Sequence, residues 1–193
     1  MRKIIILIVA VFILSNLNLF NYNEQLSQLK QKVKTNKTYN QKYAFIIDYG
    51  LHSSLDRGVL IDLSNKKKVF TFKVANGRGK SKRHNFNPQY SNKISSNNSS
   101  LGYAVLSDRG VSSWGIKINY KMDGLSETNS NIRRRNIVLH SWEGIPKYSI
   151  FPIPLPQSQG CPTVSNSDMR KINLFIQSQK NKKILIYFIN EKK

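Results

Sequence analysis

The sequence predicts a mainly β domain with a single helix near its C-terminus. Short apolar runs separated by polar turns recur between residues 43 and 120 and return at residues 184–189. Runs of this length, rich in β-branched and aromatic residues, are typical of strands. Residues 165–178 instead carry apolar side chains at intervals of three and four, which predicts an amphipathic helix. No repeat is visible, and a domain of roughly 150 residues suits one hydrophobic core.

The N-terminal segment has the features of an export signal. Met1, Arg2 and Lys3 precede an unbroken apolar run over residues 4–14. A positive head before an apolar run that is too short for a comfortable membrane span is typical of a secretory signal. No clear cleavage site follows, so residues 1–20 are either a signal peptide or an N-terminal membrane anchor. We therefore expect an exported protein of the periplasm or cell envelope.

Residues 21–41 form a polar, basic segment between this signal and the main domain. Leu26, Leu29 and Val33 recur within it at helical spacing. The segment is therefore a basic linker or a short helix, which would suit a stalk above a membrane. The domain itself is expected over residues 42–193.

The strands of the domain are predicted from apolar runs that end in polar turns. Val69–Val74 alternates apolar and polar residues as a half-buried strand does. Ser165 or Ser167 is the expected N-cap of the late helix, because a serine hydroxyl can accept a hydrogen bond from the first helical turn. The predicted strands are Tyr43–Tyr49, Gly58–Leu63, Val69–Val74, Leu101–Leu106, Trp114–Tyr120, Arg135–His140 and Ile184–Ile189.

Cys161 and His140 are the strongest candidates for chemistry. Cys161 is the one cysteine in the sequence, so in an exported protein it is either a reactive thiol or a partner in an intermolecular disulfide. His140 closes an apolar run, which places its imidazole at the end of a strand, and a proline-rich segment separates it from the cysteine. An imidazolium beside a thiol lowers the thiol pKa and makes a nucleophile. The alternative is a buried structural cysteine and an ordinary strand-end histidine.

The excess of positive charge indicates a preference for anionic partners. Lys and Arg number 31 against 10 Asp and Glu, a formal net charge of +21. Such a balance favours polyanions or an anionic membrane surface. Nucleic acid is not expected, because the lysines are spread over turns and termini and an exported protein meets little of it. His52 and His84 lie in polar loops and do not complete a zinc spacing with Cys161, so no metal or cofactor is expected.

Four segments in one order carry a resemblance to a known family. They are an opening strand over residues 44–49, the Ser-Asn and Ser-Ser-Leu-Gly elements over residues 90–102, the strand over residues 133–140, and Ser158–Pro162 around the cysteine. Together they resemble the murein L,D-transpeptidase catalytic domain family, in its branch with a Ser-x-Gly-Cys-Pro signature. The resemblance implies an L,D-transpeptidase-like β-sandwich of mixed sheets with one C-terminal helix.

The resemblance also implies acyl transfer on peptidoglycan stem peptides. With His140 as base, Cys161 would attack the carbonyl between the third, diamino acid residue and D-Ala, giving a thioester. An amine of a second stem would then form a crosslink, whereas water would make the protein an L,D-carboxypeptidase. A weakly active peptidoglycan- or polyanion-binding protein is a further alternative, because Gln159 stands where the family commonly has histidine or tryptophan.

Other residues are expected to support this chemistry. Backbone N–H groups around Gly160 and Cys161 would stabilise the oxyanion, and the carbonyl of Ser141 would orient His140. The expected oxyanion and support residues are Gly160, Ser158, Gln159 and Ser141. Arginine can hold a substrate carboxylate in a bidentate fork. The expected substrate-binding residues are Arg135, Arg133 and Asn92.

Overall fold

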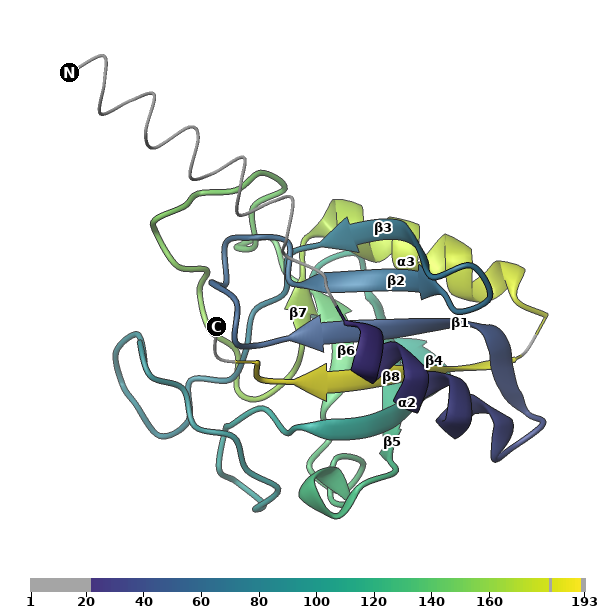
Figure 1. Ribbon diagram of the computed structural model, residues 1–193. Coiled ribbons are helices and arrows are strands. Elements are labelled where there is room, and N and C mark those ends of the chain that lie inside the picture. The colour runs from purple at the N-terminus through teal and green to yellow at the C-terminus, as the bar shows by residue number, and fades with distance from the viewer. Residues whose placement is uncertain (1–21, 181, 192–193) are drawn as a thin grey trace.

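The structure is a computed structural model that describes residues 22–180 and 182–191 (Figure 1). The predicted signal peptide or anchor over residues 1–20 lies outside these ranges. Within them, no helix is both long enough and apolar enough to cross a membrane.

Eight strands form one continuous sheet in the order β3-β2-β1-β8-β4-β5-β6-β7. Most neighbouring strands are antiparallel, but β1 and β8 are parallel, as are β6 and β7. The mainly β fold with mixed strand directions is confirmed. Figure 1 shows that β5–β7 run steeply across the direction of β1–β3, so the one sheet curls over its own core. The strands are β1 (Tyr39–Asp48), β2 (Gly58–Asp62), β3 (Lys67–Phe72), β4 (Gly102–Val111), β5 (Ile118–Gly124), β6 (Val138–Ser141), β7 (Thr163–Val164) and β8 (Lys183–Ile189).

The central strand β1 is buried on both faces of the sheet. Phe45 and Ile47 point into the larger core, which also contains the buried side chains of the late helix α3 (Asn166–Ser178). Ala44 and Ile46 point into a second cluster on the opposite face. This alternation follows from the two-residue period of a strand, and it explains why β1 reads as a continuous apolar run.

Helix α2 (Asn23–Lys34) covers the second cluster with Leu26, Leu29 and Val33, which are all buried. The helix predicted within residues 21–41 therefore exists, but it packs on the sheet and does not form a stalk (Figure 1). Strand β1 begins at Tyr39. The expected domain boundary at residue 42 is therefore wrong, because the segment before it belongs to the fold.

The strand predicted over residues 114–120 begins later than expected. Residues 114–117 form a turn, in which the Lys117 N–H donates to Trp114 O at 3.1 Å, and β5 starts at Ile118. Gly115 and Lys117 both have positive φ, which a strand does not tolerate. The turn places Trp114 at the rim of the groove described below. A short 3-10 helix, η1 (Glu127–Asn129), follows β5.

The late helix begins as predicted. The Ser165 hydroxyl accepts a hydrogen bond from the Asp168 N–H at 3.1 Å, so Ser165 and not Ser167 is the N-cap. Met169 and Ile172 are fully buried against the sheet. The cap fixes the chain direction immediately after β7. Only Pro162 separates β7 from Cys161, so the helix start also helps to position the cysteine.

Candidate active site

The parallel pairing of β6 with β7 brings the histidine and cysteine segments together. His140 lies opposite Thr163 in this pairing, two residues after Cys161. The His140 N–H donates to Pro162 O at 3.4 Å, and the Trp142 N–H donates to Val164 O at 3.1 Å. Residues 142–162, which include the proline-rich segment, form the connection between these two strands.

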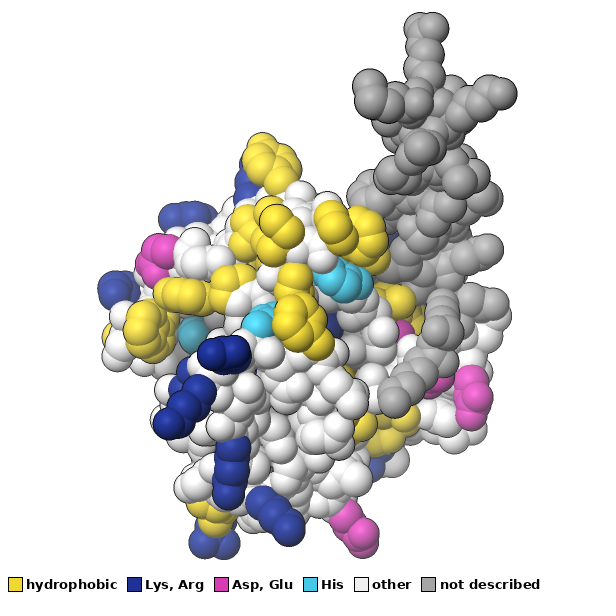
Figure 2. Space-filling model, turned by 90° about the vertical axis from the view of Figure 1, so that its left-hand side faces the viewer, with side chains coloured by type: hydrophobic (Ala, Val, Ile, Leu, Met, Phe, Trp, Pro, Cys, Tyr) yellow, Lys and Arg dark blue, Asp and Glu magenta, His cyan; other side chains and the backbone are white. Residues whose placement is uncertain are grey.

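Cys161 and His140 line one open groove with a volume of about 870 Å³. Of the predicted residues, Arg135, Ser158 and Gln159 line it as well. Arg133 and Asn92 do not. Figure 2 shows hydrophobic side chains gathered on the upper part of one face of the molecule, with histidines between them.

Gly160 and Ser158 shape the loop that presents the cysteine. Gly160 has φ of +116°, and a Cβ there would lie 2.8 Å from Ile137 Cδ1, so no other residue fits without strain. The Ser158 hydroxyl donates to Cys161 O at 2.6 Å and accepts from the Gly160 N–H at 3.1 Å. Ser158 therefore braces the loop. The prediction that the Gly160 N–H faces an oxyanion is wrong in this structure, because Ser158 already binds it.

The Cys161 N–H is the remaining candidate for an oxyanion donor. Across residues 22–180 and 182–191 it makes no hydrogen bond to another protein group. Its neighbour on the C-terminal side is Pro162, which has no N–H. One backbone N–H beside the thiol is therefore left unused by the described protein groups.

His140 is held in one tautomer. Its Nδ1 lies 3.0 Å from Ser141 O, which can only accept, so Nδ1 carries the proton and Nε2 has the lone pair. This is the role expected of the Ser141 carbonyl. Burial lowers the pKa of the imidazole, and the hydrogen bond to Ser141 offsets this only in part. His140 is therefore neutral at pH 7 and able to act as a base.

Thr163 lies between the histidine and the cysteine loop. Its hydroxyl is 3.1 Å from His140 Nε2 and 3.3 Å from Cys161 O. One hydroxyl proton cannot serve both acceptors at once, so proton uptake by Nε2 requires the threonine to turn toward Cys161 O. Sequence reasoning missed this residue, although the parallel pairing with His140 explains its place.

The thiol of Cys161 is partly buried beneath the groove. The Val138 N–H points toward Sγ at 3.5 Å, and Sγ lies 4.0 Å from Asn136 O. Burial raises the pKa of the thiol, while the Val138 N–H and the charge of Arg135 oppose the rise. The expected low-pKa thiolate beside an imidazolium is therefore wrong. The resting groups are a neutral thiol and a neutral imidazole.

Arg135 is fixed by the protein and not free to fork a carboxylate. One terminal nitrogen donates to Ser91 O and Ser100 Oγ at 2.6 Å each, and the other donates to Ser96 Oγ at 3.1 Å and to Asn98 O. All four terminal N–H groups are thus engaged. The prediction of a bidentate substrate fork is wrong, and the arginine instead organises the serine- and asparagine-rich loop and places a positive charge near Sγ.

Arg133 and Asn92 also have structural roles. Arg133 bonds to Asp123 at 2.7 Å and to Asp108 at 3.1 Å on the strand side of the turn. The side chain of Asn92 donates to Glu127 O at 2.8 Å and accepts from the Asn131 N–H at 2.9 Å. Their prediction as substrate-binding residues is therefore wrong, because neither side chain reaches the groove.

Two tryptophans at the rim of the groove were not predicted. Trp114, on the turn before β5, is 57% exposed and meets the ring of Trp142 edge-on, with 6.4 Å between ring centroids. Both line the groove. They are far apart in the sequence, and the turn over residues 114–117 brings Trp114 against Trp142. Across residues 22–180 and 182–191, no three His, Cys, Asp or Glu side chains group closely enough to hold a metal ion.

A comparison with protein families matches residues 14–188 to the family described as L,D-transpeptidase catalytic domain. The chain belongs to this family. The match covers most of the L,D-transpeptidase domain described above, including Cys161 and His140. No curated protein matches the chain.

Several solved structures align with this chain at low sequence identity. Bd1075 of Bdellovibrio bacteriovorus is 14% identical with a TM-score of 0.49, over 81% of this chain and 50% of its own. The helical cell shape determining protein Pgp2 of Campylobacter jejuni is 14% identical with a TM-score of 0.47, over 87% and 56%. The L,D-transpeptidase of Xylanimonas cellulosilytica is 15% identical with a TM-score of 0.41, over 79% and 62%. The matched region thus spans about half the length of the first two.

Proposed function

We propose that this domain is a cysteine L,D-transpeptidase acting on peptidoglycan stem peptides, with Cys161 as nucleophile and His140 as general base. The observation that carries the proposal is the shared groove, which contains the one thiol of the chain and an imidazole whose lone pair is fixed on Nε2. Membership of the L,D-transpeptidase family supports the reaction class.

The neutral resting pair defines the first step. As Sγ of Cys161 attacks the carbonyl carbon, His140 Nε2 takes the thiol proton, so thiolate forms together with the new carbon–sulfur bond. The Cys161 N–H is placed to stabilise the oxyanion, and a single donor of this kind typically contributes about 3–4 kcal/mol. The imidazolium then gives its proton to the departing D-Ala amine. The carbon–nitrogen bond breaks and a thioester remains.

The second step depends on the acceptor. An amine of a second stem attacks the thioester and forms the crosslink as the carbon–sulfur bond breaks. His140 accepts the amine proton and passes it to the departing sulfur, which restores the thiol. Water in the same position gives hydrolysis and an L,D-carboxypeptidase. We favour the amine, because Trp114 and Trp142 line a wide groove that offers a second substrate apolar contact area. The alternative of a weakly active peptidoglycan-binding protein rests on Gln159, which is exposed in the groove.

Export is part of the proposal, since peptidoglycan lies outside the cytoplasm. It rests on the positive head and apolar run of residues 1–14. Fractionation of cells that express the full chain should place it in the envelope, and removal of residues 1–20 should leave it in the cytoplasm. Equal distribution of both forms would contradict export.

The proposal is tested by following both the thioester and its products. Purified protein incubated with a carbapenem should gain the mass of one acyl group on Cys161, and Cys161→Ala should gain none. Incubation with sacculi, followed by digestion and mass analysis, should show new crosslinks or shortened stems with the wild type alone. An equal adduct on Cys161→Ala, or unchanged muropeptides with an acylated wild type, would contradict a transpeptidase or carboxypeptidase role.

A further inference from the structure

A second cavity adjoins the groove, with which it shares Gln157. It has a volume of about 440 Å³ and is called here the Arg57 pocket. Gln157 lines both cavities, and its side chain pairs with the Asn85 backbone through bonds of 2.7 and 2.9 Å, which closes a wall between them. Cys161 does not line this pocket. The residues that line it and can bear or donate a proton include Arg57, His52, His84, Asn76, Asn87 and Tyr90.

Arg57 is a buried cation without a carboxylate partner among residues 22–180 and 182–191. Its side chain is held by neutral oxygens, namely Val74 O at 2.8 Å, Leu51 O at 3.0 Å and Asn76 Oδ1 at 2.6 Å, and the residue is only 2% exposed. Burial lowers the pKa of Arg57 to about 10, so the guanidinium stays charged at neutral pH. A buried charge without a counter-ion is costly in free energy.

The nearby carboxylate of Asp48 makes no ion pair with Arg57, although its charge raises the pKa of the guanidinium and so offsets burial in part. Asp48 accepts hydrogen bonds from the Tyr22 hydroxyl at 2.9 Å, the Gly50 N–H at 2.8 Å and the Glu191 N–H at 3.0 Å, and makes no ion pair with Arg57. None of the residues that line the pocket is acidic. The pocket therefore presents a positive charge that no carboxylate of its own lining offsets.

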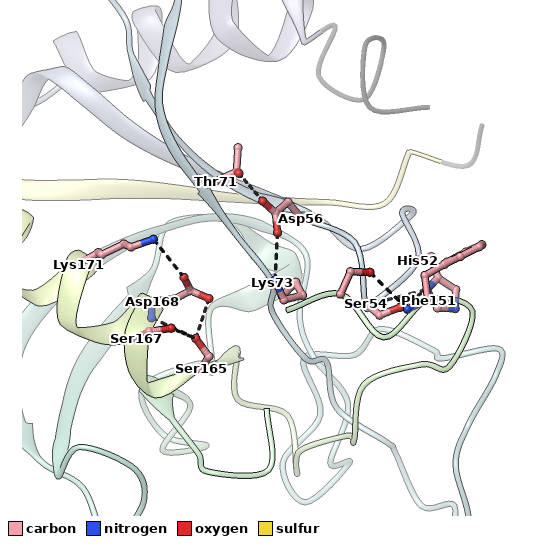
Figure 3. Close-up of polar contacts among 11 residues, drawn as sticks. His52, Ser54, Asp56, Thr71, Lys73, Phe151, Ser165, Ser167, Asp168 and Lys171 are labelled. Carbon is pink, nitrogen blue, oxygen red and sulfur yellow. Dashed lines mark hydrogen bonds and ion pairs between the residues drawn. The ribbon is translucent and has the colours of Figure 1, made fainter. Parts of the chain in front are cut away.

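Arg57 still has donors to offer. Each of its terminal nitrogens makes one hydrogen bond within the described ranges, so one N–H on each is left. A guanidinium can bind the two oxygens of a carboxylate through two such N–H groups. His52 adds a donor, because its Nδ1 accepts from Ser54 and the ring proton is therefore on Nε2. Figure 3 shows His52 between Ser54 and Phe151 of the proline-rich segment.

We propose that the Arg57 pocket binds the carboxylate group of a small organic acid. The volume lies within the range of about 300–1,000 Å³ typical of small-ligand sites. His52, Arg57 and His84 all line the pocket, and besides burial the charges of Arg57 and His84 lower the pKa of His52. An entering carboxylate supplies the missing negative charge. The site does not depend on the proposed transpeptidase activity.

The carboxylate has two possible sources, a free acid and a peptidoglycan stem, and the experiment separates them. Cys161→Ala protein, which cannot turn a stem over, is titrated with succinate and with a stem tetrapeptide, and backbone amide NMR shifts are followed. Sodium chloride at equal ionic strength controls for general screening of a basic chain. Saturable shifts of residues 50–57 and 84–90 are expected with at least one ligand, whereas shifts of residues 135–142 and 158–163 with the tetrapeptide report binding in the groove and do not count as binding in the Arg57 pocket. If only succinate shifts residues 50–57 and 84–90, the ligand is a free acid. If the tetrapeptide shifts them at lower concentration than succinate does, the ligand is the peptidoglycan stem.

Variants test whether Arg57 and the cavity carry the binding. Arg57→Gln should weaken it at least tenfold. Asn87→Trp changes an exposed residue that lines the pocket, and it should block ligand entry while leaving Arg57 intact. If Arg57→Gln does not fold, Asn87→Trp alone tests whether the ligand binds in this pocket. Arg170→Gln removes a surface charge on α3 and should bind normally. Absence of saturable shifts, equal binding by Asn87→Trp, or tighter binding of inorganic phosphate than of either carboxylate would overturn the proposal.

Discussion

The two cavities contain the same kinds of groups but arrange them for different tasks. In the groove, the terminal N–H groups of Arg135 are all engaged by the protein, and His140 presents a lone pair. In the Arg57 pocket, the arginine retains free donors, and His52 presents an N–H. Residue type therefore does not decide whether an arginine or histidine binds, catalyses or braces. The hydrogen bonds already made by the fold decide it.

Replacement of the groove histidine tests this difference most strongly. His140→Gln removes the Nε2 base, and kcat for stem turnover should fall by about 10² to 10⁴, the usual contribution of a general base. The measurement is the rate of D-Ala release, with an unchanged thermal midpoint as the control for folding. A loss of less than tenfold would show that His140 is not the base. His52→Gln in the other cavity should leave the rate close to that of the wild type.

Replacement of the engaged arginine should affect folding and thiol reactivity together. Arg135→Gln leaves several partly buried oxygens without donors, so the free energy of unfolding should fall by about 2–3 kcal/mol. It also removes a charge that lowers the Cys161 pKa.

Because that pKa then rises further, less thiolate is present at pH 8, and alkylation by iodoacetamide at this pH should be several-fold slower than in the wild type. In both proteins the rate should still be increasing above the usual thiol pKa of about 8.5. The alkylation rate is measured by quenching the reaction at set times and determining the alkylated fraction by mass spectrometry. Faster alkylation of the variant would contradict the assigned role of Arg135.

The threonine between histidine and cysteine should have a smaller effect. Thr163→Val removes the hydroxyl near Nε2 and Cys161 O while conserving shape, and a hydrogen bond of this kind contributes about 1 kcal/mol, or roughly fivefold in kcat. KM should not change, because the hydroxyl acts through His140. Thr163→Ser should recover most of the rate. Equal kcat in all three proteins would show that Thr163 has no positioning role.

The smallest effect is expected at Arg133. Its ion pairs with Asp108 and Asp123 are largely exposed, so Arg133→Gln should lower the free energy of unfolding by at most about 1 kcal/mol. Turnover of stem peptides should match the wild type, since the side chain lies away from the groove. Denaturant unfolding and D-Ala release measure the two quantities. A raised KM would restore Arg133 as a substrate-binding residue.

The local chemistry of this chain could be predicted from the sequence alone. Most of strand β1 follows from its apolar run, and a cap at Ser165 or Ser167 follows from a hydroxyl before an amphipathic helix. The resemblance around Cys161 also identified the family. These features depend on near neighbours in the chain, and near neighbours are what a sequence displays.

The tertiary structure alone decided which polar groups remain available. A distant loop engages Arg135, and Thr163 reaches His140 through a parallel strand pairing. Each of these partners is fixed by packing, and Arg135 finds its partners more than 30 residues away in the chain. A donor or acceptor has a limited number of hydrogen bonds to make. Which of them the fold has already used cannot be read from residue type and spacing.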